Sequence, residues 1–108
     1  MNALEQFKRK AGITAGFGEA QPYVRLSYIS DGHASGADAD VEFDVDTARV
    51  TVTVTEWSAR EPGYDRTRIM QIVFDGNGEI VSNDGRTFGD LLGAIDGMTP
   101  QEEEKEGR

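Results

Sequence analysis

The chain has 108 residues, a formal net charge of −9, 37% hydrophobic residues and no cysteine. This length suits one globular domain, and the absence of cysteine excludes disulfides, thiolate metal sites and cysteine nucleophiles. The acidity disfavours direct binding to nucleic acid or anionic lipid, whereas it favours a basic protein partner.

No run of residues approaches the roughly 18 consecutive apolar positions of a membrane-spanning helix. The N-terminal stretch, MNALEQFKRK, contains no apolar segment of the kind found in a secretory signal. We therefore expect a soluble, cytoplasmic protein without a membrane partner. Its oligomeric state is left open.

A short helix is predicted at residues 3–11. Asn2 and Glu5 have the spacing of a capping box, with asparagine in place of serine or threonine. Apolar residues then recur at helical spacing, and basic residues occupy the last turn. Gly12 follows at the position where a glycine commonly ends a helix.

Three strands are predicted in the middle of the chain, at 23–30, 38–46 and 49–57. The second and third alternate strictly between polar and apolar residues, which is typical of strands with one buried face. Residues 31–37 are glycine-rich and polar, and they are predicted to form a loop.

In the two alternating strands the apolar residues occupy every second position and therefore share one face of each strand. This pattern predicts the register in which the two strands pair. If residues 47–48 form a tight turn, Asp46 faces Arg49. A slip by one residue would place carboxylates in the core, so this register is strongly preferred. The expected apolar pairs are Val45–Val50, Phe43–Val52 and Val41–Val54, and the expected polar pairs are Asp44–Thr51, Glu42–Thr53 and Asp40–Thr55.

The second half of the chain continues the sheet and ends in a helix. After a loop at 58–65, strands are predicted at 66–75 and 79–82, joined by an Asp-Gly-Asn-Gly turn. Apolar residues on both parities of 66–75 indicate burial on both of its faces. Thr87 and Asp90 have the spacing of a second capping box at a helix start, and Gly97 has the position of a helix stop.

Together these elements predict an α+β fold. An antiparallel β-meander of about five strands carries a short N-terminal helix and a C-terminal helix packed on the sheet. Residues 1–98 are expected to form a single domain, and residues 99–108 a disordered acidic tail.

The sequence contains no catalytic or cofactor motif. His33, beside Asp31, has the chemistry of a general base, but no nucleophile motif accompanies it, and a single histidine cannot build a histidine-rich metal site. The stretch that begins at Asp75 resembles a calcium-binding loop only in its first five residues, where Asp75, Asn77 and Glu79 alternate. Its sixth and twelfth positions are Ile80 and Arg86, where glycine and glutamate are required. We expect no enzyme activity, cofactor or metal.

The most unusual feature is that every second residue of 38–46 is acidic. We expect its five carboxylates to stand outward on one strand face, about 6.8 Å apart, too far to converge on one metal ion. They form either a solvated surface that prevents pairing with other chains or a site for a basic partner. The residues are Asp38, Asp40, Glu42, Asp44 and Asp46.

Trp57 has the same outward parity and would lie opposite Asp38 in the predicted register. Exposed tryptophan is favoured at protein interfaces. Alternatively, the strand ends before Trp57 and the ring folds against the edge of the core. Arg25, Arg66 and Arg68 are candidates to pair with the acids, and the sequence leaves open which of them lies nearby.

In size, charge and lack of catalytic residues, the chain is similar to the phage-encoded DNA-mimic inhibitors of restriction and CRISPR systems. This resemblance implies a small non-enzymatic protein that uses the acidic strand and Trp57 to occupy a basic, nucleic-acid-binding surface of a partner. The alternative is a small-molecule-binding or enzymatic α+β domain, monomeric or dimeric. Its polar groups would come from residues such as Tyr28, Arg68 and Gln71.

Overall fold

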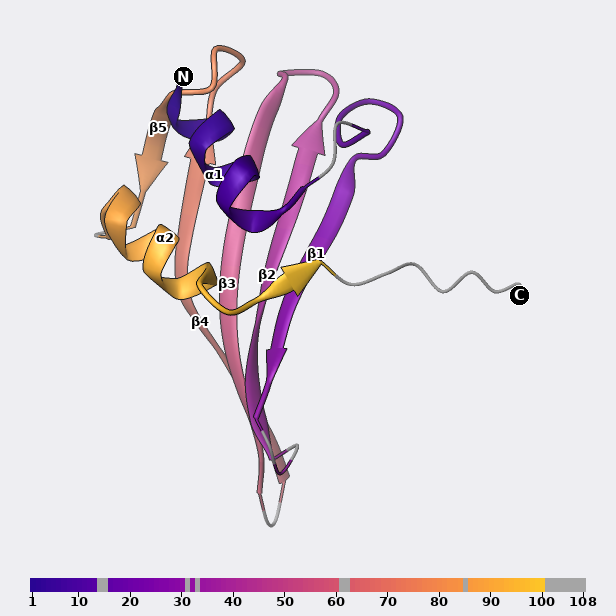
Figure 1. The fold of residues 1–108 in the computed structure, drawn as a ribbon, viewed down its shortest axis with the longest axis vertical. Helices are drawn as coiled ribbons and strands as arrows, with labels where there is room; N and C mark the ends of the chain where they lie inside the picture. The colour runs from indigo at the N-terminus through magenta and orange to yellow at the C-terminus, as the bar shows by residue number, and fades with distance from the viewer. Residues whose placement is uncertain (14–15, 31, 33, 61–62, 85, 101–108) are drawn as a thin grey trace.

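The fold is a twisted antiparallel sheet with two helices on one face, seen in a computed structural model (Figure 1). The structure describes residues 1–13, 16–30, 32, 34–60, 63–84 and 86–100. The strand order is β5-β4-β3-β2-β1-β6. The elements are α1 (Ala3–Ala11), β1 (Tyr23–Ile29), β2 (Ser35–Asp44), β3 (Arg49–Arg60), β4 (Gly63–Phe74), β5 (Ile80–Asn83), α2 (Phe88–Ile95) and β6 (Thr99–Pro100).

The predicted α+β class is confirmed, with six strands in place of five. The sixth strand consists of Thr99 and Pro100, which pair with Ser27 and Leu26 of β1. These two residues fall within the predicted tail, whereas residues 101–108 lie outside the described part of the chain. No helix in the described part is long and apolar enough to cross a membrane.

Both helices begin at the predicted capping boxes. The Asn2 side chain accepts a hydrogen bond from the Glu5 backbone N–H, and the Glu5 carboxylate accepts one from the Asn2 N–H. Thr87 and Asp90 make the same reciprocal pair at the start of α2. Gly12 ends α1 in the left-handed conformation, with φ of 73°. Local sequence therefore defines both helix starts.

The core lies between the helices and the near face of the sheet. The alternating apolar residues of β2 and β3 all point toward it, as predicted from their parity. In Figure 1 the helices cover only the upper part of the sheet, and the lower ends of β1 to β4 extend past them. The largest fully buried side chains are Phe7, Phe74, Leu26, Ile72, Leu91, Ile95, Val41, Val52 and Val54.

The predicted register of the β2–β3 hairpin was wrong by two residues. Asp44, not Asp46, pairs with Arg49, so Phe43 lies opposite Val50 and Val45 is 55% exposed in the turn. A two-residue hairpin turn needs positive φ at one or both positions, which is unfavourable for a β-branched threonine at position 47. The observed turn spans residues 45–48 and needs positive φ only at Ala48, where it is 61°.

A shift of two residues keeps the paired side chains of β2 and β3 on their predicted faces but changes their neighbours, while Val45 leaves the strand. The polar pairs are Glu42–Thr51, Asp40–Thr53 and Asp38–Thr55.

The three central strands are longer than predicted. Residues 35–37, 58–60 and 63–65 were expected in loops, but they belong to β2, β3 and β4 respectively. Their backbones continue the ladder, for example through the pairs Ser35–Ser58 and Ser58–Asp65. Alternating hydrophobicity did not indicate this extension because the helices do not cover it, and uncovered strands need no apolar face.

A β-bulge in β4 explains its apolar residues on both parities. Val54 pairs with Met70 and the next residue, Thr55, pairs with Arg68, so Ile69 is the additional residue. Met70, Ile72 and Phe74 are buried on the side that carries the helices, while Ile69 and Val73 are half-buried. Beyond the bulge the alternation is reversed, which places Arg66 and Arg68 on the face away from the helices.

Candidate interaction surface

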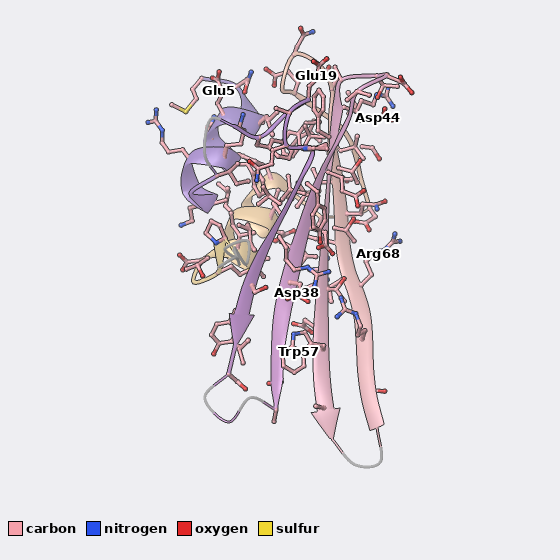
Figure 2. All side chains as sticks on the ribbon, turned by 90° about the vertical axis from the view of Figure 1, so that its right-hand side faces the viewer. Glu5, Glu19, Asp38, Asp44, Trp57 and Arg68 are labelled. Carbon is pink, nitrogen blue, oxygen red and sulfur yellow. The ribbon has the colours of Figure 1, made fainter. Side chains whose placement is uncertain are left out.

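The sheet face away from the helices, here called the outer face, carries most of the predicted site residues. Figure 2 shows Asp38, Trp57 and Arg68 along this face and Asp44 at its end. Strand pairing arranges its side chains in lateral rows of four. These rows are Tyr23–Glu42–Thr51–Val73, Arg25–Asp40–Thr53–Gln71, Ser27–Asp38–Thr55–Arg68 and Ile29–Gly36–Trp57–Arg66.

Asp40 lies at the centre of a polar network between β1 and β2. Its Oδ1 accepts a hydrogen bond from Arg25 Nε at 2.8 Å and one from the Tyr23 hydroxyl at 2.5 Å. On the other side of Asp40, the Gln71 side-chain amide donates to the Thr53 hydroxyl at 3.0 Å. The carboxylate therefore has a cation and a hydroxyl donor at short range.

Asp38 is more deeply enclosed, since only 7% of the residue is exposed. Its Oδ1 accepts a hydrogen bond from the Ser27 hydroxyl at 3.0 Å. Its Oδ2 lies 3.5 Å from Arg66 Nη1 and 3.9 Å from Arg25 Nη1. A buried carboxylate requires such partners, because an unpaired charge away from water is strongly unfavourable.

The five carboxylates of residues 38–46 therefore differ in their surroundings, and the arginines that the sequence left open as partners are Arg25 and Arg66. Two of the five, Asp38 and Asp40, are neutralised by arginines from β1 and β4. The pairing with Arg66 depends on the β4 bulge, which no glycine or proline marks in the sequence. The sequence indicated the position of Arg25 only weakly, because the polar residues Tyr23, Arg25 and Ser27 alternate along β1 and therefore share one face.

The network changes the pKa values of its members. Burial alone would raise the pKa of Asp40, but the hydrogen bonds from Arg25 and Tyr23, with the charges of Arg25 and Arg66, hold it below its ordinary value of 3.8. Burial and the adjacent Asp40 carboxylate raise the pKa of Tyr23 above 10.0. The hydrogen bond to Asp40 raises the pKa of Arg25, so this residue stays a cation.

The lowered pKa of Asp40 predicts a pH-dependent contribution to stability. Because the folded pKa lies below the unfolded one, this contribution is present above the unfolded value of 3.8 and is lost as pH falls through the folded value. We expect Asp40→Asn to destabilise the protein by about 1–2 kcal/mol at neutral pH. The difference from wild type should shrink between about pH 5 and pH 2 in urea unfolding curves. A difference that stays constant over this range would contradict the prediction.

The other three carboxylates of the row lie at the opposite end of β2. Glu42, Asp44 and Asp46 are exposed, and none forms an ion pair with another residue of the described chain. Asp44 also accepts a hydrogen bond from the Asp46 backbone N–H at 2.9 Å, which stabilises the turn. Figure 2 shows Glu19, also exposed, at the same end of the molecule. We call Glu19, Glu42, Asp44 and Asp46 the acidic end.

Trp57 lies within β3 on the outer face, so the strand does not end before it. It pairs with Gly36, not with the predicted Asp38. Its indole crosses the neighbouring strand, because a Cβ added at Gly36 would lie 2.8 Å from an indole carbon. Glycine at position 36 is therefore needed for this packing, and Trp57 is half-buried.

The residues of the alternative small-molecule site are not brought together. Arg68 and Gln71 lie on the outer face, whereas Tyr28 alternates to the face that carries the helices. His33 and Asp31 lie outside the described residues. Among the residues that the structure describes, no group of three or more metal-ligating side chains could hold an ion.

Comparison with known proteins identifies no relative. No family model matches the chain, and no curated protein or solved structure matches it.

Proposed function

We propose that this protein is a small acidic interaction protein that binds a basic surface of a partner protein through its acidic end. One observation carries the proposal. Glu42, Asp44 and Asp46 remain exposed and without an ion pair in the described chain, while Asp38 and Asp40 of the same strand are neutralised. Within residues 38–46, the negative charge without an ion pair thus lies at and beside the β2–β3 turn.

The turn presents this charge on a well-defined backbone. The Ala48 N–H donates to the Asp44 carbonyl oxygen at 2.8 Å, and the Arg49 N–H donates to the Thr47 hydroxyl at 3.3 Å. A turn fixed in this way loses little conformational entropy when a partner binds. The net charge of −9 would also accelerate encounter with a basic surface at low salt.

In the specific form of this proposal, the partner is a nucleic-acid-binding protein and the acidic end occupies its phosphate-binding groove. Arginine and lysine side chains that bind phosphate oxygens also bind carboxylates, with similar charge-assisted hydrogen bonds. Binding would then inhibit the partner by competition with nucleic acid.

The triple variant Glu42→Gln, Asp44→Asn, Asp46→Asn tests the proposal. It removes three charges, so the net charge changes from −9 to −6, and asparagine at position 44 can still accept the turn hydrogen bond. If each carboxylate makes one exposed ion pair, worth about 0.2–1 kcal/mol, affinity for the partner should fall by about 3- to 100-fold. The matched control is Glu102→Gln, Glu103→Gln, Glu104→Gln, which has the same net charge.

The partner is obtained by affinity capture from lysates of cells that contain restriction or CRISPR nucleases. Fluorescence anisotropy of a labelled DNA duplex then measures competition for the captured protein. We expect the wild type and the control to displace DNA and the triple variant to displace it poorly, with all binding weakened as salt rises from about 50 to about 500 mM. Equal affinity of the triple variant and the control, or binding that persists at high salt, would overturn the proposal.

A further inference from the structure

A second surface, on the helix-bearing side of the sheet, forms a groove of about 430 Å³. It lies where the lower ends of the strands extend past the helices in Figure 1. We call it the tip groove. Its lining residues are Tyr28, Ser35, Gly36, Ala37, Glu56, Trp57, Ser58, Asp65 and Thr67.

Strand register explains why a groove forms there. The last row of the core is Leu26–Ala39–Val54–Met70, and all four of its residues are at most 2% exposed. The next row, Tyr28–Ala37–Glu56–Thr67, faces the same side but has no helix above it. Small residues at 35–37 and 58 form the floor, so the groove is the uncovered continuation of the core face.

The tip groove is anionic. Glu56 and Asp65 are both exposed, and none of the lining residues that the structure describes is basic. The nearest arginines of β4, Arg66 and Arg68, alternate to the outer face and cannot neutralise these carboxylates from within the groove. Tyr28, 51% exposed, adds an aromatic wall.

We infer that the tip groove binds the guanidinium or ammonium group of a basic peptide segment. Glu56 and Asp65 would accept its charge-assisted hydrogen bonds, and the ring of Tyr28 would contact the cation or the apolar stem of its side chain. The volume suits one or two side chains, since it falls near the lower limit for small-ligand pockets.

This inference does not depend on the proposed function. Ala37 at the tip groove and Glu42 at the acidic end are five residues apart on β2, which is about 17 Å at the rise of a strand, and their side chains stand on opposite faces of the sheet. The two sites can therefore be tested separately.

Trp57 provides a reporter, because it is the only tryptophan in the chain and one of the lining residues, with its indole across Gly36 on the opposite face of the same strands. The probe is a capped peptide of alternating arginine and alanine, with the glutamate–alanine peptide as its control. We expect saturable changes in Trp57 fluorescence with the arginine peptide alone. Amide NMR shifts should involve Ala37, Glu56 and Ser58. Shifts at residues 44–49, which report contact with the acidic end, should be the same in the wild type and in the groove variants.

The variant Glu56→Gln, Asp65→Asn removes two exposed ion pairs and should weaken peptide binding by about 2- to 30-fold. Its matched control, Glu102→Gln, Glu103→Gln, has the same net charge of −7, from −9 plus 2, and should bind as wild type does. Ala37→Leu fills the floor without changing charge and should weaken binding to a similar extent. Unchanged binding by the groove variants, or NMR shifts confined to other surfaces, would overturn the inference while leaving the proposed function intact.

Discussion

Phe74→Ala is expected to destabilise the protein by about 3–5 kcal/mol, the range for removing a large aromatic side chain from a core. Phe74 is fully buried on β4. Its ring lies 5.9 Å from the ring of Phe7 in α1 and 6.4 Å from that of Phe88 in α2. One side chain thus joins both helices to the sheet, so its loss leaves a cavity at the junction of all three elements.

Urea unfolding followed by circular dichroism measures this effect. Val81→Ala on the neighbouring strand β5 is the control, because Val81 is 47% exposed and its truncation should change stability by less than about 0.5 kcal/mol. Phe74→Leu should be less destabilising than Phe74→Ala, because it leaves a smaller cavity. If Phe74→Ala were no more destabilising than Val81→Ala, the helices would not be packed as described.

Arg25→Met is expected to destabilise the protein by about 1–3 kcal/mol. Removing one partner of a buried ion pair typically costs about 3–5 kcal/mol. We expect less here because the Arg25 side chain is 36% exposed, so water can solvate part of the network. The loss arises from Asp40, whose strongest hydrogen bond disappears, and from Asp38, which keeps only Arg66 among its ion-pair partners in the described chain.

Arg68→Met is the matched control for this prediction. Arg68 lies on the same outer face, is exposed, and makes no ion pair with another described residue. Its substitution should change stability by less than about 0.5 kcal/mol. The double variant Arg25→Met, Asp40→Asn should recover part of the loss, because it removes the carboxylate that Arg25→Met leaves without an ion pair in the described chain. Equal effects of Arg25→Met and Arg68→Met would show that the network contributes nothing specific.

The network also changes which carboxylates are available to a partner. Charges that are already paired inside the protein must be separated from their arginines before they can bind another cation, and this separation is unfavourable. Asp38 and Asp40 therefore act as structural residues of the outer face. The carboxylates of the acidic end and of the tip groove have no such ion pair in the described part of the chain.

The sequence by itself determined where both helices start and which faces of β2 and β3 are apolar. The capping boxes at Asn2 and Thr87 define helix starts through contacts within three residues, so no tertiary information is needed. The alternation in β2 and β3 determines which side chains are buried, because a strand has a period of two and carboxylates are excluded from a core.

Tertiary structure decided which side chains become neighbours. A two-residue shift in the β2–β3 register leaves both faces intact, so apolar parity cannot distinguish the two pairings; the conformation of the turn at Ala48 selects one. The β4 bulge and the position of β1 beside β2 bring Arg66 and Arg25 to Asp38. Such contacts join residues far apart in the chain, and their energies depend on strand order and on local irregularities that alternation does not encode. For this reason the acidic strand could be recognised from sequence, whereas its division into neutralised and available carboxylates could not.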